Sequence, residues 1–173
     1  MLEVIILAAG QGSRMQSSTP KVLHTLAGRP LVTHVLQAAR RLNADRIHVV
    51  VGYGAEAVNS AVAAADVQCH LQAEQLGTGH AVKQAIGSCE PTSTVVVLFG
   101  DVPLITERAL TSVLAKAETG VAMLSATLAN PAGYGRVVRS SDGEFVAVVE
   151  EKDATPEQRA LQEINTGVLA ATA

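Results

Sequence analysis

The sequence predicts an α/β fold with a mostly parallel central sheet. Short apolar runs at residues 4–8, 47–51 and 94–99 are typical of strands buried on both faces. Segments with apolar residues at helical spacing alternate with these runs. The chain has 173 residues, of which 48% are hydrophobic, and this suffices for a domain with a sizeable core.

Strands and helices alternate along the first 128 residues. Strands are expected at residues 4–8, 47–51, 67–71, 94–99 and 121–128, and helices at 30–42, 55–65, 78–86 and 107–118. Thr78 is expected to cap the third helix. These elements predict a nucleotide-binding core of Rossmann-like type in residues 1–128.

Residues 129–173 have a different pattern. Two short runs at 135–139 and 145–149, joined by a Ser-Ser-Asp-Gly turn, predict a β-hairpin. A short helix at 155–161, with Thr155 as its cap, and a last strand at 165–171 follow. We expect an appended lobe for substrate binding. Because the sequence stops within an apolar run, we also expect it to be the front part of a longer protein.

Composition argues against several classes of protein. A net charge of −3, no basic tract and 2% aromatic residues argue against a nucleic-acid partner. No segment has the length of a membrane span or the features of a signal peptide. Cys69 and Cys89 form no disulfide framework, which favours a reducing, cytoplasmic location. The cysteines and the five histidines lack metal-ligand spacing, and the histidines are expected to be structural or solvent-facing.

The loop after the first strand has the layout of a phosphate-binding loop. Gly10 and Gly12 allow close backbone approach, and Arg14 and Lys21 supply cations. Lys21 lies between Pro20 and Val22, unlike the lysine of a Walker A loop. An NAD-binding loop is disfavoured because Met15 stands where a third glycine is needed. The structural alternative is a simple turn with solvated cations.

Two further polar clusters follow predicted strands, at the sheet edge where α/β proteins bind ligands. In the first, Gln72 offers a carboxamide that can read a nucleobase, and Gly77 and Thr78 follow it. In the second, Asp101 follows Gly100 and can hold Mg²⁺ against phosphate oxygens. The alternatives are an exposed Gln72 and an Asp101 that only caps a turn.

The predicted lobe carries polar groups suited to a carbohydrate. Gly135 can present a backbone amide, and Glu150 and Asn165 can hydrogen-bond to sugar hydroxyls. The alternative for Glu150 is a charged strand end. These residues contain no Ser-His-Asp or Cys-His arrangement.

The motifs together resemble a known family. LAAGQGSRM at 7–15, with Pro20 and Lys21, is similar to the signature of sugar-phosphate nucleotidyltransferases. LQAEQLGTGH at 71–80, GDVPL at 100–104, GYGR at 133–136 and EINTG at 163–167 narrow the resemblance to bacterial N-acetylglucosamine-1-phosphate uridyltransferases. The resemblance covers essentially the whole chain.

The resemblance implies transfer of a uridyl group from UTP to N-acetylglucosamine 1-phosphate. The products are pyrophosphate and UDP-N-acetylglucosamine, a precursor of peptidoglycan and lipopolysaccharide. It implies Mg²⁺ at Asp101 and catalytic roles for Arg14 and Lys21. The implied nucleotide-binding residues are Leu7, Ala9, Gly10, Gly12, Lys21, Gln72, Gly77 and Thr78, and the implied sugar-binding residues are Phe99, Gly135, Glu150 and Asn165.

Departures from the family pattern leave other functions open. The family's second metal ligand, and the C-terminal β-helix acetyltransferase domain through which full-length relatives form trimers, are expected to lie beyond this sequence. Phe99 stands where some relatives have Tyr, so a hydroxyl near the sugar is lost. One alternative is a nucleotide-binding fragment with little or no turnover. Another is a related nucleotidyltransferase that uses a different base or sugar.

Overall fold

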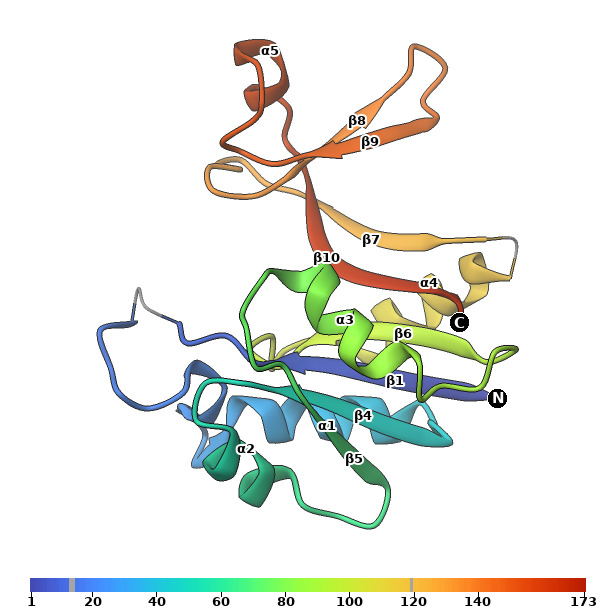
Figure 1. Ribbon diagram of the computed structural model, residues 1–173. Coiled ribbons are helices and arrows are strands. Elements are labelled where there is room, and N and C mark those ends of the chain that lie inside the picture. Colours follow the sequence, from blue (N-terminus) through green and yellow to red (C-terminus); the bar gives the residue numbers. More distant parts are fainter. Residues whose placement is uncertain (13–14, 119) are drawn as a thin grey trace. The chain divides into compact units, whose positions relative to one another are not determined.

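The computed structural model describes residues 1–12, 15–118 and 120–173 and has an α/β fold (Figure 1). The chain divides into two compact units. The first comprises Met1–Ala122 and Leu169–Ala173, and the second comprises Met123–Val168. The expected assignment of residues 129–173 to sugar binding stays a prediction.

A parallel sheet forms the centre of the first unit. Its strands lie in the order β5 (Val67–Leu71), β4 (Arg46–Val51), β1 (Leu2–Ala8) and β6 (Thr94–Phe99), and each neighbouring pair is parallel. The last residues of β10 (Glu163–Thr172) pair antiparallel with β6. The predicted mostly parallel sheet is confirmed.

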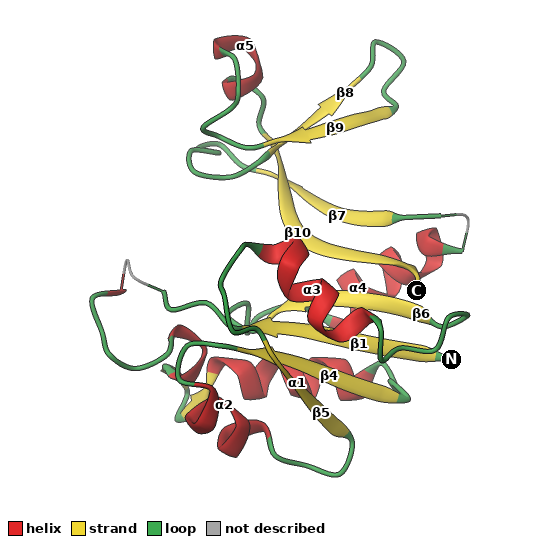
Figure 2. Ribbon diagram, viewed as in Figure 1, coloured by secondary structure: helices red, strands yellow, loops and turns green. Residues whose placement is uncertain are grey.

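Helices cover both faces of this sheet (Figure 2). Along β1, side chains alternate between the two faces. Ile5 and Leu7 share a buried cluster with Ala81 and Ala85 of α3 (Thr78–Ile86). The opposite face is covered by α1 (Leu31–Arg41), which buries Val32, Val35 and Leu36. α2 (Ala55–Val62) and α4 (Glu107–Ala117) complete the unit.

The structure differs from the sequence prediction at three places in this unit. α2 ends at Val62 instead of residue 65, because Ala63 takes an extended ψ of 116°. Thr78 does not cap α3: the N-cap is Gly77, and no side chain caps this end. The segment before α1 contains a 3-10 turn, η2 (Lys21–Leu23), and a pair of very short strands, β2 (Thr25–Leu26) and β3 (Arg29–Pro30), which the sequence did not reveal.

The second unit is built around the predicted hairpin. β8 (Arg136–Arg139) pairs antiparallel with β9 (Phe145–Val149), and β7 (Ala122–Thr127) pairs with β10. Thr155 caps α5 (Pro156–Arg159) through a complete capping box with Gln158, as its sequence predicts, but the helix ends two residues before residue 161. Among the described residues, no helix has both the length and the apolar character needed to cross a bilayer.

Glu163 ties three strands of the second unit together. Its carboxylate accepts hydrogen bonds from Arg139 of β8 at 2.7 Å and from Ser125 of β7 at 2.6 Å. Arg139 first, and Ser125 second, lower the pKa of Glu163 from its ordinary 4.5 to about 2. The folded state therefore stabilises the ionised carboxylate of Glu163.

This pKa shift predicts how acid destabilises the second unit. Because the folded-state pKa of Glu163 is depressed, its stabilisation is complete above about pH 4.5 and is lost as the pH falls toward 2. In Glu163→Gln, the protection of the amides of residues 123–168 against hydrogen exchange, relative to the unfolded chain at the same pH, is expected to be lower than in the wild type at pH 7. This protection is also expected to change less between pH 5 and 2. Glu74→Gln, an exposed change in the first unit, serves as the control. Equal acid sensitivity of Glu163→Gln and the wild type would contradict the prediction.

Candidate functional site

The loop after β1 begins the candidate site at the carboxyl edge of the parallel strands. Gly12 has a φ of 70°, and a Cβ placed on it would come within 2.6 Å of the Cβ of Lys21. Glycine is needed here for both conformation and space. The Met15 amide donates to the Gly12 carbonyl at 2.9 Å. The expected catalytic Arg14 lies outside the described residues.

A cation and a carboxylate meet in the site. Lys21 begins η2, and its Nζ forms an ion pair with Oδ2 of Asp101, just beyond the end of β6. Gly100 holds this segment close to β1, because its amide donates to the Leu7 carbonyl at 2.9 Å. Both charged side chains are partly exposed, at 42% for Lys21 and 22% for Asp101, so a ligand can reach them.

Gln72 is the most buried polar group of the site, with 3% exposure. Its backbone amide donates to the Val51 carbonyl at 2.7 Å, which continues the pairing of β5 with β4. Its side-chain Nε2 donates to the Gly77 carbonyl at 3.2 Å and lies 3.0 Å from Nδ1 of His80. The amide nitrogen is thus engaged within the protein, and the amide oxygen stays available to a ligand.

These segments enclose a pocket of about 310 Å³, a size at the lower end of small-molecule sites. Every nucleotide-binding residue expected from the sequence lines it, together with Phe99 and Asp101. The lining residues are Leu7, Ala9, Gly10, Gly12, Lys21, Val22, Gln72, Gln75, Gly77, Thr78, Ala81, Phe99 and Asp101. The pocket lies entirely within the first unit.

Sequence reasoning missed Val22, Gln75 and Ala81. Gln75 is the polar one of the three, and its Nε2 donates to the Gln72 carbonyl at 3.4 Å. A Cβ on Gly52 would lie 3.0 Å from the same Nε2 and 2.9 Å from the Cβ of Ala9. Gln75 therefore lies next to Ala9, at the start of the loop that follows β1. A second carboxamide within the motif that carries Gln72 was the signal that could have found it.

The remaining sugar-binding candidates lie together in the second unit. The Asn165 amide donates to the Gly135 carbonyl at 2.9 Å, and a Cβ on Gly135 would lie 3.2 Å from Oε1 of Glu150. The Asn165 side chain accepts a hydrogen bond from the Gly167 amide at 2.8 Å. The structure thus brings Gly135, Glu150 and Asn165 close to one another.

Two solved structures illustrate what this fold is similar to. A structure assigned as a glucose-1-phosphate thymidylyltransferase from Bacillus anthracis matches with a TM-score of 0.81 at 17% identity, covering 99% of this chain and 72% of that one. HddC from Yersinia pseudotuberculosis, complexed with GMP-PN, matches with a TM-score of 0.75 at 20% identity, covering 99% and 77%. At these identities the likeness shows a shared Rossmann-like α/β fold and no more.

Residues 4–165 match the model of the MobA-like NTP transferase domain, and the chain belongs to this family. Its curated relatives include the "Bifunctional protein GlmU" of Paraburkholderia xenovorans, 53% identical over 171 residues, and that of Saccharophagus degradans, 52% identical over 171 residues. Each alignment covers 98% of this chain and 38% of the relative. The resemblance expected from the motifs is confirmed, and the chain spans less than half the length of these relatives.

The geometry of Gly12 predicts the effect of adding one methyl group. Gly12→Ala is expected to lower the free energy of unfolding by roughly 1–3 kcal/mol, because Ala disfavours a positive φ and its Cβ meets Lys21. Gly10→Ala is the matched control, since a Cβ there has no atom within 4 Å, and its change should stay within about 0.5 kcal/mol. Urea unfolding of both variants measures the difference, and equal stabilities would refute this account of the loop.

Proposed function

We propose that this chain binds UTP and N-acetylglucosamine 1-phosphate and transfers the uridyl group, releasing pyrophosphate and forming UDP-N-acetylglucosamine. The observation that carries the proposal is the single pocket that brings together the glycine loop, Lys21, Gln72 and Asp101. The nucleotidyltransferase family and the GlmU relatives support it. UTP is a cytoplasmic substrate, and we propose that the activity is cytoplasmic.

The proposed reaction needs positioning and charge stabilisation more than covalent chemistry. A phosphate oxygen of the sugar attacks the α-phosphorus of UTP, a new phosphorus–oxygen bond forms, and the bond to pyrophosphate breaks. Lys21 neutralises negative charge on the phosphates during this step. Arg14, proposed from the sequence, would act on the leaving pyrophosphate in the same way.

The pocket has the ligand chemistry that Mg²⁺ requires. Asp101 supplies a carboxylate in the pocket, and Mg²⁺ is commonly held by one or two carboxylates together with substrate phosphates. Its present partner, Lys21, can move to the phosphates of a bound nucleotide and release the carboxylate. A bound Mg²⁺ would neutralise phosphate charge and orient the triphosphate.

Recognition of the base is assigned to Gln72 and Gly77. Because Nε2 of Gln72 is engaged by Gly77 and His80, its Oε1 is presented as an acceptor. The N3–H of uracil is a suitable donor for this oxygen. Leu7 and Ala9 supply apolar and backbone contacts in the same pocket.

Among the residues proposed from the sequence for the sugar, Gly135, Glu150 and Asn165 lie together in the second unit, and Phe99 lines the pocket of the first. Gly135 lacks a side chain next to Glu150, which leaves room beside the carboxylate. Glu150 and Asn165 offer hydrogen-bonding groups of the kind that bind hydroxyls and amides. Phe99 contributes only apolar contact.

Base recognition can be tested by calorimetric titration. Wild-type chain is expected to bind UDP-N-acetylglucosamine and UTP and to ignore NAD. Gln72→Ala should weaken both uridine ligands roughly tenfold, the size of one or two lost hydrogen bonds. Gln68→Ala, an exposed glutamine change on the same strand, should leave both affinities unchanged. Binding of CTP and UTP with equal affinity would favour a nucleotidyltransferase of different base specificity.

The assignment of Mg²⁺ to Asp101 predicts how the ion changes the affinity for UTP. Mg²⁺ is expected to tighten UTP binding to the wild type by roughly tenfold or more and to have little effect on Asp101→Asn. Without Mg²⁺, Asp101→Asn should bind UTP at least as tightly as the wild type, because a carboxylate no longer repels the phosphates. Asp142→Asn, in the exposed hairpin turn, is the control. Mg²⁺ enhancement that survives in Asp101→Asn would remove Asp101 from the metal site.

Turnover is measured separately, as pyrophosphate release from UTP with N-acetylglucosamine 1-phosphate. Release that depends on both substrates supports the proposed reaction. Tight binding of UDP-N-acetylglucosamine without any release would instead favour the alternative, a nucleotide-binding fragment.

A further inference from the structure

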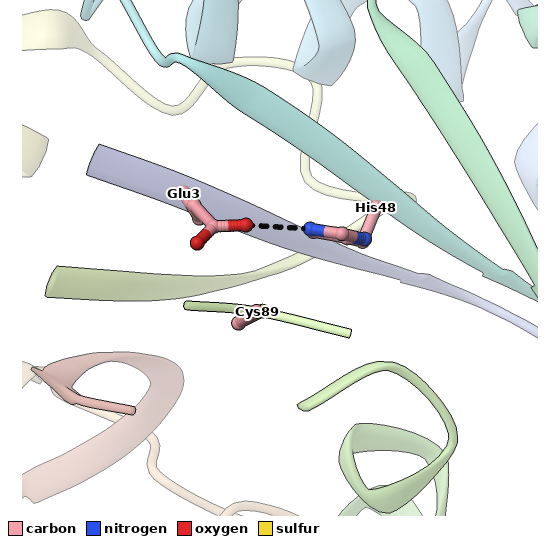
Figure 3. Close-up of side chains that lie close together, drawn as sticks. All are labelled: Glu3, His48 and Cys89. Carbon is pink, nitrogen blue, oxygen red and sulfur yellow. Dashed lines mark hydrogen bonds and ion pairs between the residues drawn. The ribbon is translucent and has the colours of Figure 1, made fainter. Parts of the chain in front are cut away.

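A buried polar cluster lies at the opposite end of β1 from the pocket. It consists of Glu3 on β1, His48 on β4 and Cys89, which follows α3 (Figure 3). Glu3 and His48 are 0% exposed, and Cys89 is 8% exposed. Glu3 and Ala9 are six residues apart on an extended strand, which places the cluster about 20 Å from the glycine loop.

The three side chains of this cluster bring potential metal-ligand atoms close together. His48 Nε2 lies 2.9 Å from Oε2 of Glu3, and the Glu90 amide donates to Oε1 of Glu3 at 2.8 Å. The three potential ligand atoms, a carboxylate oxygen, an imidazole nitrogen and a thiol sulfur, all lie within 4.8 Å of one another. The residues come from three separate elements, so any group that joins them also cross-links the sheet to the segment after α3.

The charges in this cluster are unusual for an apolar core. Burial raises the pKa of Glu3, but hydrogen bonds from His48 and the Glu90 amide outweigh it, so the pKa lies below its ordinary value. Burial, and the nearby negative charge of Glu3, raise the pKa of the Cys89 thiol to about 11. The Glu3 carboxylate and the His48 ring are fully buried, and Cys89 belongs to the same apolar cluster as Ile5, Ala85 and Val95. The pocket at the other end of β1 gives no reason for burying these polar groups, because none of them lines it.

We propose that Glu3, His48 and Cys89 form a binding site for a divalent transition metal of the zinc class. Thiolate, imidazole and carboxylate are all established zinc ligands. A Zn²⁺ ion bound by one thiolate, one carboxylate and one neutral imidazole has no net charge, which lowers the cost of burying it. Magnesium is disfavoured here because it prefers oxygen ligands.

His70 supplies the outer contact that such a site needs. Nδ1 of His48 lies 3.0 Å from Nε2 of His70 on the neighbouring strand β5. Metal-bound histidines characteristically donate their second ring N–H to a nearby acceptor, which fixes the ring. With the metal on Nε2, His48 would donate from Nδ1 to His70. The half-buried position of His70 also connects the cluster to solvent.

Metal binding releases protons from the ligand side chains. The Cys89 Sγ–H bond breaks, the proton leaves to solvent, and the sulfur bonds to the metal. Nε2 of His48 likewise gives up any proton that it carries toward Glu3, so the metal replaces their hydrogen bond. The ion is neither oxidised nor reduced. Its role is structural, since it lies far from the pocket and joins β1, β4 and the segment after α3.

The test uses Co²⁺ as a coloured substitute for zinc and the chain's second cysteine as the control. Cys69 is exposed on β5, and Cys69→Ser leaves Cys89 as the chain's one remaining thiol. One equivalent of Co²⁺ is expected to give thiolate-to-cobalt absorption in the wild type and equally in Cys69→Ser. Zn²⁺ should abolish this absorption by displacement and raise the melting temperature of both proteins.

The reciprocal variant removes the proposed ligand. Cys89→Ala is expected to lose the absorption and to weaken Co²⁺ binding by more than about 100-fold, beyond the loss seen for outer-contact residues. X-ray absorption of the zinc form of Cys69→Ser should show a sulfur at about 2.3 Å, a measurement that leaves the buried cluster unaltered. UTP binding to the pocket is read separately, so failure here is distinguishable from failure of the proposed function.

Three outcomes would overturn the proposal. The first is no metal binding by folded wild-type chain at equimolar ion. The second is loss of the absorption in Cys69→Ser, which would assign the ion to a surface site at Cys69 and His70. The third is a zinc shell without sulfur in Cys69→Ser.

Discussion

The parallel pairing of β1 with β4 on one side and β6 on the other is the constraint on which the rest of the structure depends. Val4 is in register with Ile47 of β4 and with Val96 of β6, and residues Val4 to Ala8 are buried on both faces. Parallel strands end at the same edge of a sheet. Because β5 is in turn parallel to β4, the loops after β1, β5 and β6 lie at one edge, and the pocket forms where they meet. The same pairing fixes Glu3 beside His48 at the opposite edge.

Much of the fold could be predicted because its strands are buried runs with sharp limits. The expected bounds of 67–71, 78–86 and 94–99 agree with β5, α3 and β6. Each begins or ends at a change from polar or glycine-rich to apolar sequence. The antiparallel pairing of Leu169 with Val97 could not be predicted, because an apolar run does not specify its partner or direction. The short pair β2 and β3 has too few residues to form a periodic pattern.

The two polar sites differ in how far sequence could reveal them. Lys21, Gln72 and Asp101 each follow a predicted strand, and strand order then brings them to one edge. Gln75 depends on the local path of its loop, which hydrophobic periodicity does not describe. Glu3 and His48 each stand alone in an apolar run, Cys89 lies in a polar segment, and no spacing among the three marks a metal site. Only the lateral order of the strands and the return of the chain after α3 bring them together.

The ion pair between Lys21 and Asp101 shows how the pocket can hold opposite charges before a nucleotide binds. Partly exposed pairs contribute roughly 0–1 kcal/mol, so separating this pair costs little. A nucleoside triphosphate carries roughly four negative charges and outcompetes one carboxylate for the lysine. Once Lys21 has turned to the phosphates, Asp101 carries an unpaired negative charge next to them, which is unfavourable unless a cation joins the two. In the proposed function, nucleotide binding and cation binding are therefore coupled by the same two side chains.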